Sequence, residues 1–219
     1  DDKVILYYHG GGYSVGSYNT HRALIARIAR AAGHPVLAIN YRMAPEHPFS
    51  AALEDAVMAY KQLQADGWHS IFLAGDSAGG GLSLATTMKL REEGVKLPTA
   101  LITISPWTDL TLSGDSIRTK ADVDPLIEPR LLEIFAKKYY QNHDPKNPFI
   151  SPLFGTFEGF PPIYIQVGGN EVLLDDSTRL AQKMKKAGVK VEFELWDHKM
   201  HVWHNLAGIV PEANMAIDK

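Results

Sequence analysis

The 219-residue sequence contains no cysteine, which excludes disulfide bonds and thiolate metal ligands. It also has no excess of one charge, because 22 Lys and Arg stand against 25 Asp and Glu. This balance argues against nucleic acid or an anionic membrane surface as the main partner. No apolar run reaches the roughly 18 residues that a membrane-spanning helix needs. The lack of cysteine is compatible with a reducing compartment, and we expect a cytoplasmic location.

What is present fits one globular domain over residues 1–219, with 45% hydrophobic and 21% charged residues. The chain opens directly on an apolar stretch, DDKVILYY, without a leader or an initiator methionine. We therefore expect the domain to be trimmed at both ends, with a last helix that is shorter than in the full fold.

Six short runs are apolar or β-branched, as strands are. They are residues 4–8, 35–39, 70–74, 100–104, 162–167 and 189–195. The first five are nearly continuous in hydrophobicity, which predicts strands covered on both faces. The sixth alternates apolar with charged residues, which predicts a strand near a sheet edge with one face in water.

Apolar residues recur at helical spacing between these runs, and Gly33, Gly67 and Gly188 stand just past three of the helices, where a left-handed cap is common. The repeated order of strand, helix and strand predicts an α/β fold with a doubly wound, mostly parallel sheet. Residues 106–161 hold seven of the 13 prolines and one clear helix, near 130–140. We interpret them as an excursion over the upper edge of the sheet.

A serine lies between two glycines in the stretch GDSAG, residues 75–79, directly after the strand at 70–74. Glycines at these positions allow a sharp turn from strand to helix, which holds the serine hydroxyl above the sheet at the positive end of the helix. Ser77 is therefore a candidate nucleophile. The alternative is a serine that only caps the helix.

Three glycines follow the first strand, in His9-Gly10-Gly11-Gly12. Backbone N–H groups in such a loop can approach a ligand closely, and they would stabilise a carbonyl oxygen that becomes negative. A phosphate-binding loop would need G-x-G-x-x-G or a P-loop lysine, and neither is present. A flexible turn is the remaining alternative.

Four stretches together resemble the hormone-sensitive-lipase-like family of α/β-hydrolase carboxylesterases. They are HGGG at 9–12, YRMAPEHPF at 41–49, GDSAGG at 75–80 and SPWTDLT at 105–111. The resemblance implies the α/β-hydrolase fold, with these six strands as the third to eighth of eight and the N-terminal helical cap missing. It also implies an oxyanion hole from the N–H groups of Gly11, Gly12 and Ala78, with His9 organising the loop. No metal or organic cofactor is implied.

A serine nucleophile needs a base, and α/β-hydrolases order serine, acid and histidine along the chain. This order points to DHKMHVWH at 197–204. His201 is the candidate, because an aromatic residue follows at the second position as in the family. His198 comes soon after the last strand, and His204 lies a turn further on. A metal site made from the three histidines would lack the usual helix spacing and a fixed carboxylate ligand.

Three carboxylates stand close together in GGNEVLLDDST, residues 168–178. Glu171 follows a strand and a glycine turn, where the acid of a triad belongs, and it leads a motif that matches the family's acid-x-Leu-x-Asp-Asp/Glu pattern. Glutamate here departs from the commoner aspartate. Asp175 and Asp176 begin the next helix, where they favour the helix dipole, and Asp175 faces Arg179 at i+4. Asp175 is the alternative acid.

Several other residues could line a substrate pocket, although aromatic side chains are more often core. The candidates are Tyr13, Asp76, Trp107 and Phe154. Asp76 can also balance the helix N-terminus beside Ser77, and Asp109 is expected to tie its own loop together.

The sequence thus predicts a serine carboxylesterase with Ser77, Glu171 and His201 as catalytic residues. The resemblance to the family implies short-to-medium acyl esters as substrates. An amidase, deacetylase or thioesterase with the same residues is the alternative within enzymes. A non-catalytic receptor on the same fold, like the plant gibberellin receptors that lack the histidine, is the alternative from another class. By resemblance to many family members we also expect a homodimer through residues 189–195.

Overall fold

The computed structural model describes residues 2–219, and in this part of the chain it contains one six-stranded sheet. The strands are β1 (Lys3–Tyr8), β2 (Val36–Ile39), β3 (Ser70–Asp76), β4 (Leu101–Ile104), β5 (Ile163–Gly168) and β6 (Val191–Trp196). The helices are α1 (Tyr18–Ala32), α2 (Ala51–Ala65), α3 (Ala78–Glu92), α4 (Ser116–Thr119), α5 (Pro129–Tyr140), α6 (Leu174–Lys186) and α7 (Pro211–Ile217), with short 3₁₀ helices η1 (Pro152–Phe154) and η2 (Trp203–Leu206). The six strands predicted from the sequence are all present.

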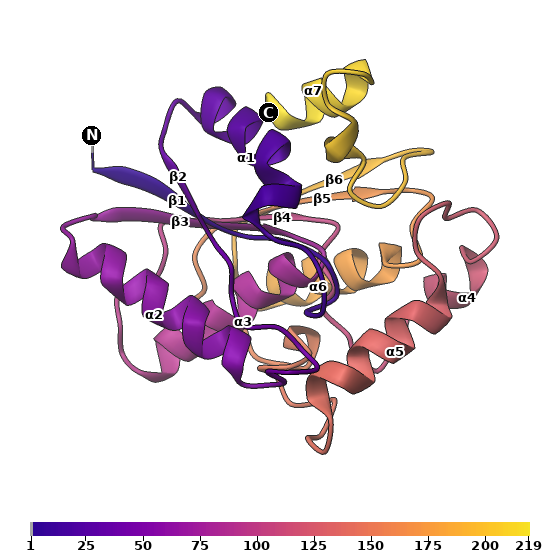
Figure 1. Cartoon of the computed structure of the whole chain (residues 1–219), viewed down its shortest axis with the longest axis horizontal. Helices are drawn as coiled ribbons and strands as arrows, with labels where there is room; N and C mark the ends of the chain where they lie inside the picture. Colours follow the sequence, from indigo (N-terminus) through magenta and orange to yellow (C-terminus); the bar gives the residue numbers. More distant parts are fainter. Residues whose placement is uncertain (1) are drawn as a thin grey trace.

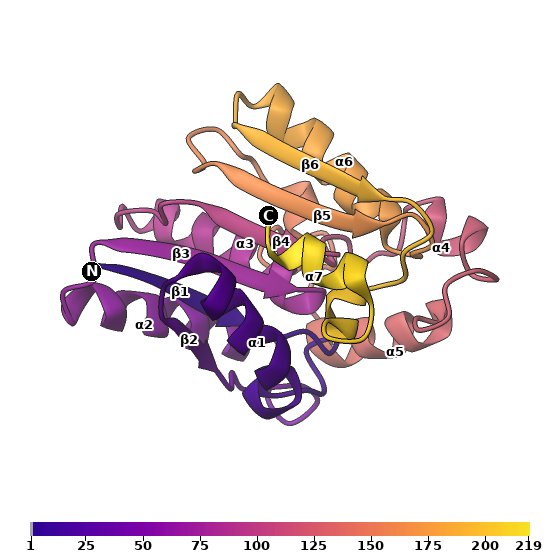
Figure 2. The same ribbon diagram turned by 90° about the horizontal axis from the view of Figure 1, so that it is seen from above.

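The strand order is β2-β1-β3-β4-β5-β6, and every neighbouring pair is parallel. Helices α1 and α7 cover one face of the sheet, and α2, α3 and α6 cover the other (Figures 1 and 2). The chain therefore turns to opposite sides after β1 and after β3. Loops that diverge in this way leave a crevice at the carboxyl ends of the two strands, where open α/β sheets bind their ligands.

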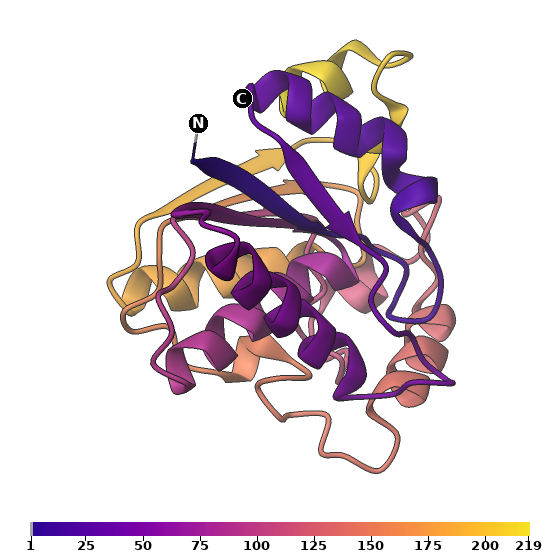
Figure 3. The same cartoon turned by 60° about the vertical axis from the view of Figure 1, so that its left-hand side comes forward.

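Helices cover both faces of the sheet (Figure 3). The buried core has a large part on one face, a small part on the other, and a third part formed by Trp203, Ala213 and Ala216. In β1, Val4, Leu6 and Tyr8 belong to the large part, beneath α2 and α3. Ile5 and Tyr7 belong to the small part, beneath α1. Successive side chains of a strand point to opposite faces, so burial of both sets confirms the prediction that β1 is covered on both sides.

The sequence predicted the exposure of one edge strand of the sheet correctly and that of the other incorrectly. β6 lies at one edge, as the alternation of its residues indicated. β2 lies at the other edge, and Leu37 in its middle is 41% exposed, so the prediction of full cover was wrong for residues 35–39. An apolar run shows only that the side chains are hydrophobic. How far they are buried depends also on whether the strand has a neighbour on each side.

The segment between β4 and β5 passes over the carboxyl ends of the strands, as predicted (Figure 1). Its main helix is α5, which begins with a proline at its first position and buries Leu132, Ala136 and Tyr139 on one face. The short helix α4 was not predicted. Residues just before and within α5, from Leu126 to Phe135, line the cavity beside the ends of β1 and β3.

Candidate active site

Ser77 lies at the sharp turn between β3 and α3, with φ of 52° and ψ of −120°. This positive φ is rare for a residue with a side chain, and it marks a constrained position. The glycines around it are needed for space, because a Cβ at Gly79 would collide with the carbonyl oxygen of Tyr8 and one at Gly75 with that of Gly79. The hydroxyl of Ser77 is thus presented at the positive end of a 15-residue helix.

The glycine loop follows β1, directly beside β3 in the sheet. Gly11 and Gly12 have φ of 115° and 61°, which only glycine adopts readily. Within residues 2–219, the N–H groups of Gly11, Gly12 and Ala78 donate to no protein acceptor. These three groups are therefore free to bind an oxygen atom of a ligand.

Asp76 connects the glycine loop to the strand that carries Ser77. Its buried carboxylate accepts hydrogen bonds from the N–H of Gly10 at 3.0 Å and from the hydroxyl of Tyr7 at 2.6 Å. Nε2 of His21 lies 3.3 Å from the same carboxylate. Asp76 lines the cavity over Ser77, and its hydrogen bonds hold the glycine loop rather than the start of α3.

His9 begins this loop, and its ring stacks on Tyr41 with centroids 4.4 Å apart. Its Nδ1 lies 2.7 Å from the carbonyl oxygen of Gly10. Burial lowers the pKa of His9, so the ring is neutral near pH 7. The side chain therefore supports the loop that follows it.

Glu171 and His201 form a buried pair. Oε2 of Glu171 lies 2.9 Å from Nδ1 of His201, while Oε1 accepts hydrogen bonds from the N–H of Gly168 at 2.6 Å and from the hydroxyl of Ser105 at 2.7 Å. Burial alone would lower the pKa of His201, but the hydrogen bond and charge of Glu171 outweigh it and raise this pKa above 6.5. His201 alone among the three histidines at 197–204 contacts this acid.

The neighbouring histidines lie elsewhere. His198 is exposed. His204 is buried against β5, where its Nε2 lies 2.8 Å from Oε1 of Gln166, and burial lowers its pKa to about 3. The described residues 2–219 contain no group of three His, Asp or Glu side chains placed to hold a metal ion.

The two aspartates after Glu171 have different partners from those predicted. Asp175 accepts a hydrogen bond from the N–H of Ser116 at 2.9 Å. Its predicted pairing with Arg179 was wrong, because Arg179 binds Asp109 instead, with 3.0 Å between Nη1 and Oδ2. Asp109 also accepts hydrogen bonds from Thr111 and Ser113, so it ties its own loop together as expected.

Asp176 lies in the first turn of α6 and is fully buried. It accepts hydrogen bonds from the N–H groups of Thr108 at 2.6 Å and Asp109 at 2.8 Å. Burial, and then the charge of Asp109, raise the pKa of Asp176 to about 7. Its role is to anchor the loop after β4 against α6.

A cavity of about 530 Å³ opens over Ser77 and His201. Gly11, Gly12 and Asp76 line the same cavity, so the predicted nucleophile, base and N–H donors meet in one place. The opposite wall is apolar and comes mainly from the loop after β1 and from the segment ending in α5. These wall residues are Val15, Leu126, Ile127, Leu131, Leu132 and Phe135.

Three of the predicted contact residues do not line this cavity. Tyr13 and Trp107 are completely buried in the core, and Tyr13 stacks on Tyr139 with centroids 3.9 Å apart. Phe154 lines a separate surface pocket beside Arg91. Sequence reasoning also missed Ser105 and Asp124; the carboxylate of Asp124 accepts hydrogen bonds from the N–H groups of Leu126, Ile127 and Val172. Ser105 offered one signal, since it follows a strand at the same sheet edge.

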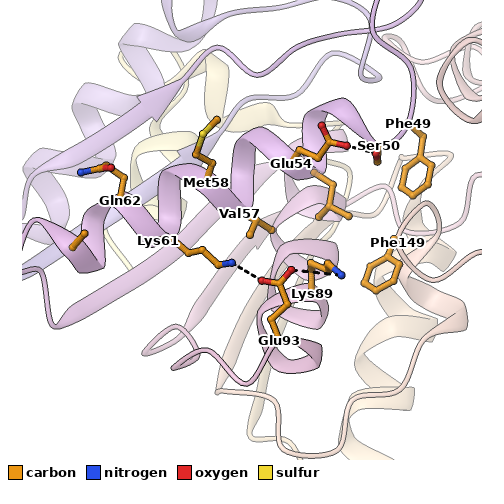
Figure 4. A pocket seen from close by; sticks show the side chains of 12 residues that line it. Phe49, Ser50, Glu54, Val57, Met58, Lys61, Gln62, Lys89, Glu93 and Phe149 are labelled. Carbon is orange, nitrogen blue, oxygen red and sulfur yellow. Dashed lines mark hydrogen bonds and ion pairs between the residues drawn. The ribbon is translucent and has the colours of Figure 1, made fainter.

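A larger cavity of about 710 Å³ lies between α2 and α3 (Figure 4). Its charged groups bind one another: Nζ of Lys61 lies 2.6 Å from Glu93, and Nζ of Lys89 lies 3.5 Å from it (Figure 4). Its one serine, Ser50, donates a hydrogen bond to Glu54, but among the described residues no histidine lines this cavity and no glycine loop borders it. Size therefore does not identify the candidate active site, whereas the chemistry of the lining does.

Comparison with known proteins agrees with this geometry. Residues 5–205 match the family described as alpha/beta hydrolase fold. An acetyl-hydrolase of Streptomyces hygroscopicus is 44% identical over 220 residues, which cover 100% of this chain and 74% of that protein. An esterase of Acinetobacter venetianus is 36% identical over 218 residues, covering 98% and 72%. The crystal structure of an esterase from the bacterial hormone-sensitive lipase family superposes with a TM-score of 0.98 at 46% identity, covering 100% and 74%.

Proposed function

Because the chain belongs to the hormone-sensitive-lipase-like family of α/β-hydrolases, we propose that it hydrolyses carboxylic esters with Ser77 as the nucleophile. The observation that carries this proposal is one cavity lined by Ser77, by the N–H donors of the glycine loop and by a histidine held by a buried carboxylate. This combination is the machinery of serine acyl transfer.

In the first half of the reaction, Oγ of Ser77 attacks the ester carbonyl while Nε2 of His201 takes its proton. Glu171 accepts the hydrogen bond from Nδ1–H, so it fixes the tautomer that leaves Nε2 free as a base. The imidazolium that forms is stabilised by the same carboxylate. Nε2–H then protonates the leaving alcohol, and an acyl-enzyme remains on Ser77.

The negative charge on the carbonyl oxygen is received by the N–H groups of Gly11, Gly12 and Ala78. They have no competing acceptor within the described chain, so no internal hydrogen bond has to break when substrate binds. Such donors act where charge develops, and each contributes roughly 3 kcal/mol to the transition state. In the second half, a water activated by His201 releases the acid and regenerates Ser77.

The substrate class follows from the walls of the cavity. Its apolar side suits an acyl chain, and membership of the family supports short-to-medium acyl esters over long triglycerides. An amidase, deacetylase or thioesterase would use the same residues. Relative kcat/KM on matched ester and anilide substrates separates these classes, and a non-catalytic receptor would turn over neither.

Covalent labelling tests the nucleophile directly. After treatment with a sulfonyl fluoride, peptide mass mapping should find the label on Ser77 and activity should be lost in proportion. Ser77→Ala should be folded, unlabelled and inactive. Unlabelled protein with full activity would remove the proposed mechanism.

Two further properties stay proposals. We propose a homodimer through β6, because this edge strand has unpaired backbone groups and exposes 47% of Leu195. Sedimentation as a monomer at micromolar concentration would contradict it. A cytoplasmic location stays a prediction from the sequence. Over residues 2–219, no helix combines the length and the apolar character that crossing a membrane would require.

A further inference from the structure

The carboxyl end of β4 lies between the strand that carries Ser77 and the strand that precedes Glu171. It binds the nucleophile turn on one side, because the N–H of Ser77 donates to the carbonyl oxygen of Ile104 at 2.9 Å. The N–H of Trp107 donates to the carbonyl oxygen of Ser77, also at 2.9 Å. Residues 104–107 are thus attached to the backbone of Ser77 at two points.

Ser105 connects the same segment to the acid and to the histidine loop. Its hydroxyl donates to Oε1 of Glu171 at 2.7 Å and accepts a hydrogen bond from the N–H of Val202 at 3.2 Å. Val202 directly follows His201. A serine hydroxyl has one proton to donate, and this proton is committed to the carboxylate oxygen that does not face His201. Ser105 is completely buried and does not line the cavity.

The backbone at both ends of this bridge is unusual. Ser105 and Val202 each have φ of 47°, in the left-handed region that residues with side chains rarely occupy. For the β-branched Val202 this conformation is a clear outlier. Such conformations persist only where the surroundings hold them, and they cluster at functional sites. One hydrogen bond joins the two residues.

We propose that Ser105 is a positioning residue for the reaction. It holds the carboxylate of Glu171 and the turn after His201 in one arrangement, and through residues 104–107 it places both relative to Ser77. This inference rests on the proposed function of Glu171 and His201. It concerns a residue that touches neither the substrate nor the reacting atoms.

The test replaces Ser105 with alanine and with glycine. Both variants lack the hydroxyl, but glycine adopts the positive φ without strain and alanine does not. We expect kcat to fall about 10- to 100-fold in both, as for other residues that orient a catalytic group, with KM within about twofold of the parent. If only the backbone conformation at residue 105 mattered, and not the hydroxyl, the glycine variant would keep the parent kcat. That result would overturn the proposal.

Thr103 supplies a matched control on the same strand. It is also completely buried, and its hydroxyl has no hydrogen-bond partner within the described residues. Thr103→Val removes a buried hydroxyl two positions away and should leave kcat unchanged within about twofold. An equal loss in Thr103→Val and in Ser105→Ala would mean that kcat reports packing in β4, and the proposal would fail.

A double-mutant cycle with Glu171→Gln distinguishes this inference from the proposed function. If Ser105 acts through Glu171, then Ser105→Gly should cost little further kcat in the Glu171→Gln background. Full additivity would contradict the inference while leaving the triad intact. Unchanged kcat in Glu171→Gln alone would instead contradict the assignment of the acid. Because glycine removes the backbone strain, the cycle remains measurable even where the alanine variant does not fold.

Discussion

Nδ1 of His201 lies 2.9 Å from Oε2 of Glu171, and the two residues are 3% and 0% exposed. The acid follows β5 and the histidine follows β6, which are neighbours in the sheet. The carboxylate of Glu171 therefore reaches the imidazole across the ends of two adjacent strands. In this dry environment the contact decides both the tautomer and the proton affinity of the base.

The first prediction separates the two candidate acids. Glu171→Gln should lower kcat by roughly 10³- to 10⁴-fold, because an amide can hold the wrong tautomer of His201 and cannot stabilise its cation. Asp175→Asn should change kcat by less than about tenfold, since Asp175 binds the N–H of Ser116 instead. Steady-state kinetics on one water-soluble ester gives both values. A larger loss in Asp175→Asn would transfer the role of acid to Asp175.

The second prediction concerns the pH dependence of kcat/KM. The reaction needs neutral His201, so activity should fall as the pH drops through the pKa of this group in the free enzyme. Glu171 raises that pKa above 6.5, so the acid limb should lie above pH 6.5. Residual activity of Glu171→Gln should show a limb at lower pH, because the attraction of the carboxylate for the proton is gone. An unshifted limb would show that another group sets it.

The third prediction uses Asp176 and concerns stability. Its folded-state pKa of about 7 lies above the ordinary 3.8, so the folded state holds a proton that the unfolded chain releases first. This contribution is complete below about pH 4 and is lost as the pH rises through about 7. Asp176→Asn keeps an acceptor oxygen and cannot ionise, so its stability relative to the parent should increase between pH 5 and pH 8.

The gain should be a few kcal/mol at most, at about 1.4 kcal/mol per pKa unit. Asp176→Leu is the contrasting variant, because it leaves the N–H groups of Thr108 and Asp109 without their acceptor. It should cost roughly 1–3 kcal/mol for each orphaned group. Denaturant unfolding at several pH values measures both. A parallel pH dependence in the parent and in Asp176→Asn would rule out a raised pKa.

The fourth prediction compares the loss of stability on alanine substitution at two glycines, Gly79 and Gly33, where the loss has different causes. A Cβ at Gly79 would collide with the backbone of Tyr8, so Gly79→Ala should cost at least about 2 kcal/mol and displace β1 from α3. Gly33 has φ of 65°, and an alanine methyl there would meet nothing within 4 Å, so Gly33→Ala should cost only about 1 kcal/mol. Activity of the folded fraction should fall in the first variant and stay unchanged in the second. Equal effects would show that close packing at Gly79 is unimportant.

Local patterns were sufficient for the strands, for the turn at Ser77 and for the glycine loop, because each depends on residues adjacent in the chain. Order along the chain pointed to residues 197–204 for the base, and resemblance to the family's motifs was needed to choose His201 there and Glu171 as the acid; the two are in contact. The predicted partner of Arg179 was wrong. Arg179 binds Asp109, which is 70 residues away in the chain, instead of the neighbouring Asp175. The role proposed for Ser105 could not be predicted, since its one signal, a place at a strand end, does not identify Glu171 and Val202 as its partners.

The reacting groups and the apolar wall of the cavity come from different parts of the chain. Ser77, Glu171 and His201 stand at strand ends, whereas Leu131 and Phe135 belong to α5, which contributes none of them. Substitutions in this helix can therefore alter which esters are accepted while the proton-transfer groups keep their places. The ester-facing wall can therefore be varied through α5 without replacing any of the three reacting residues.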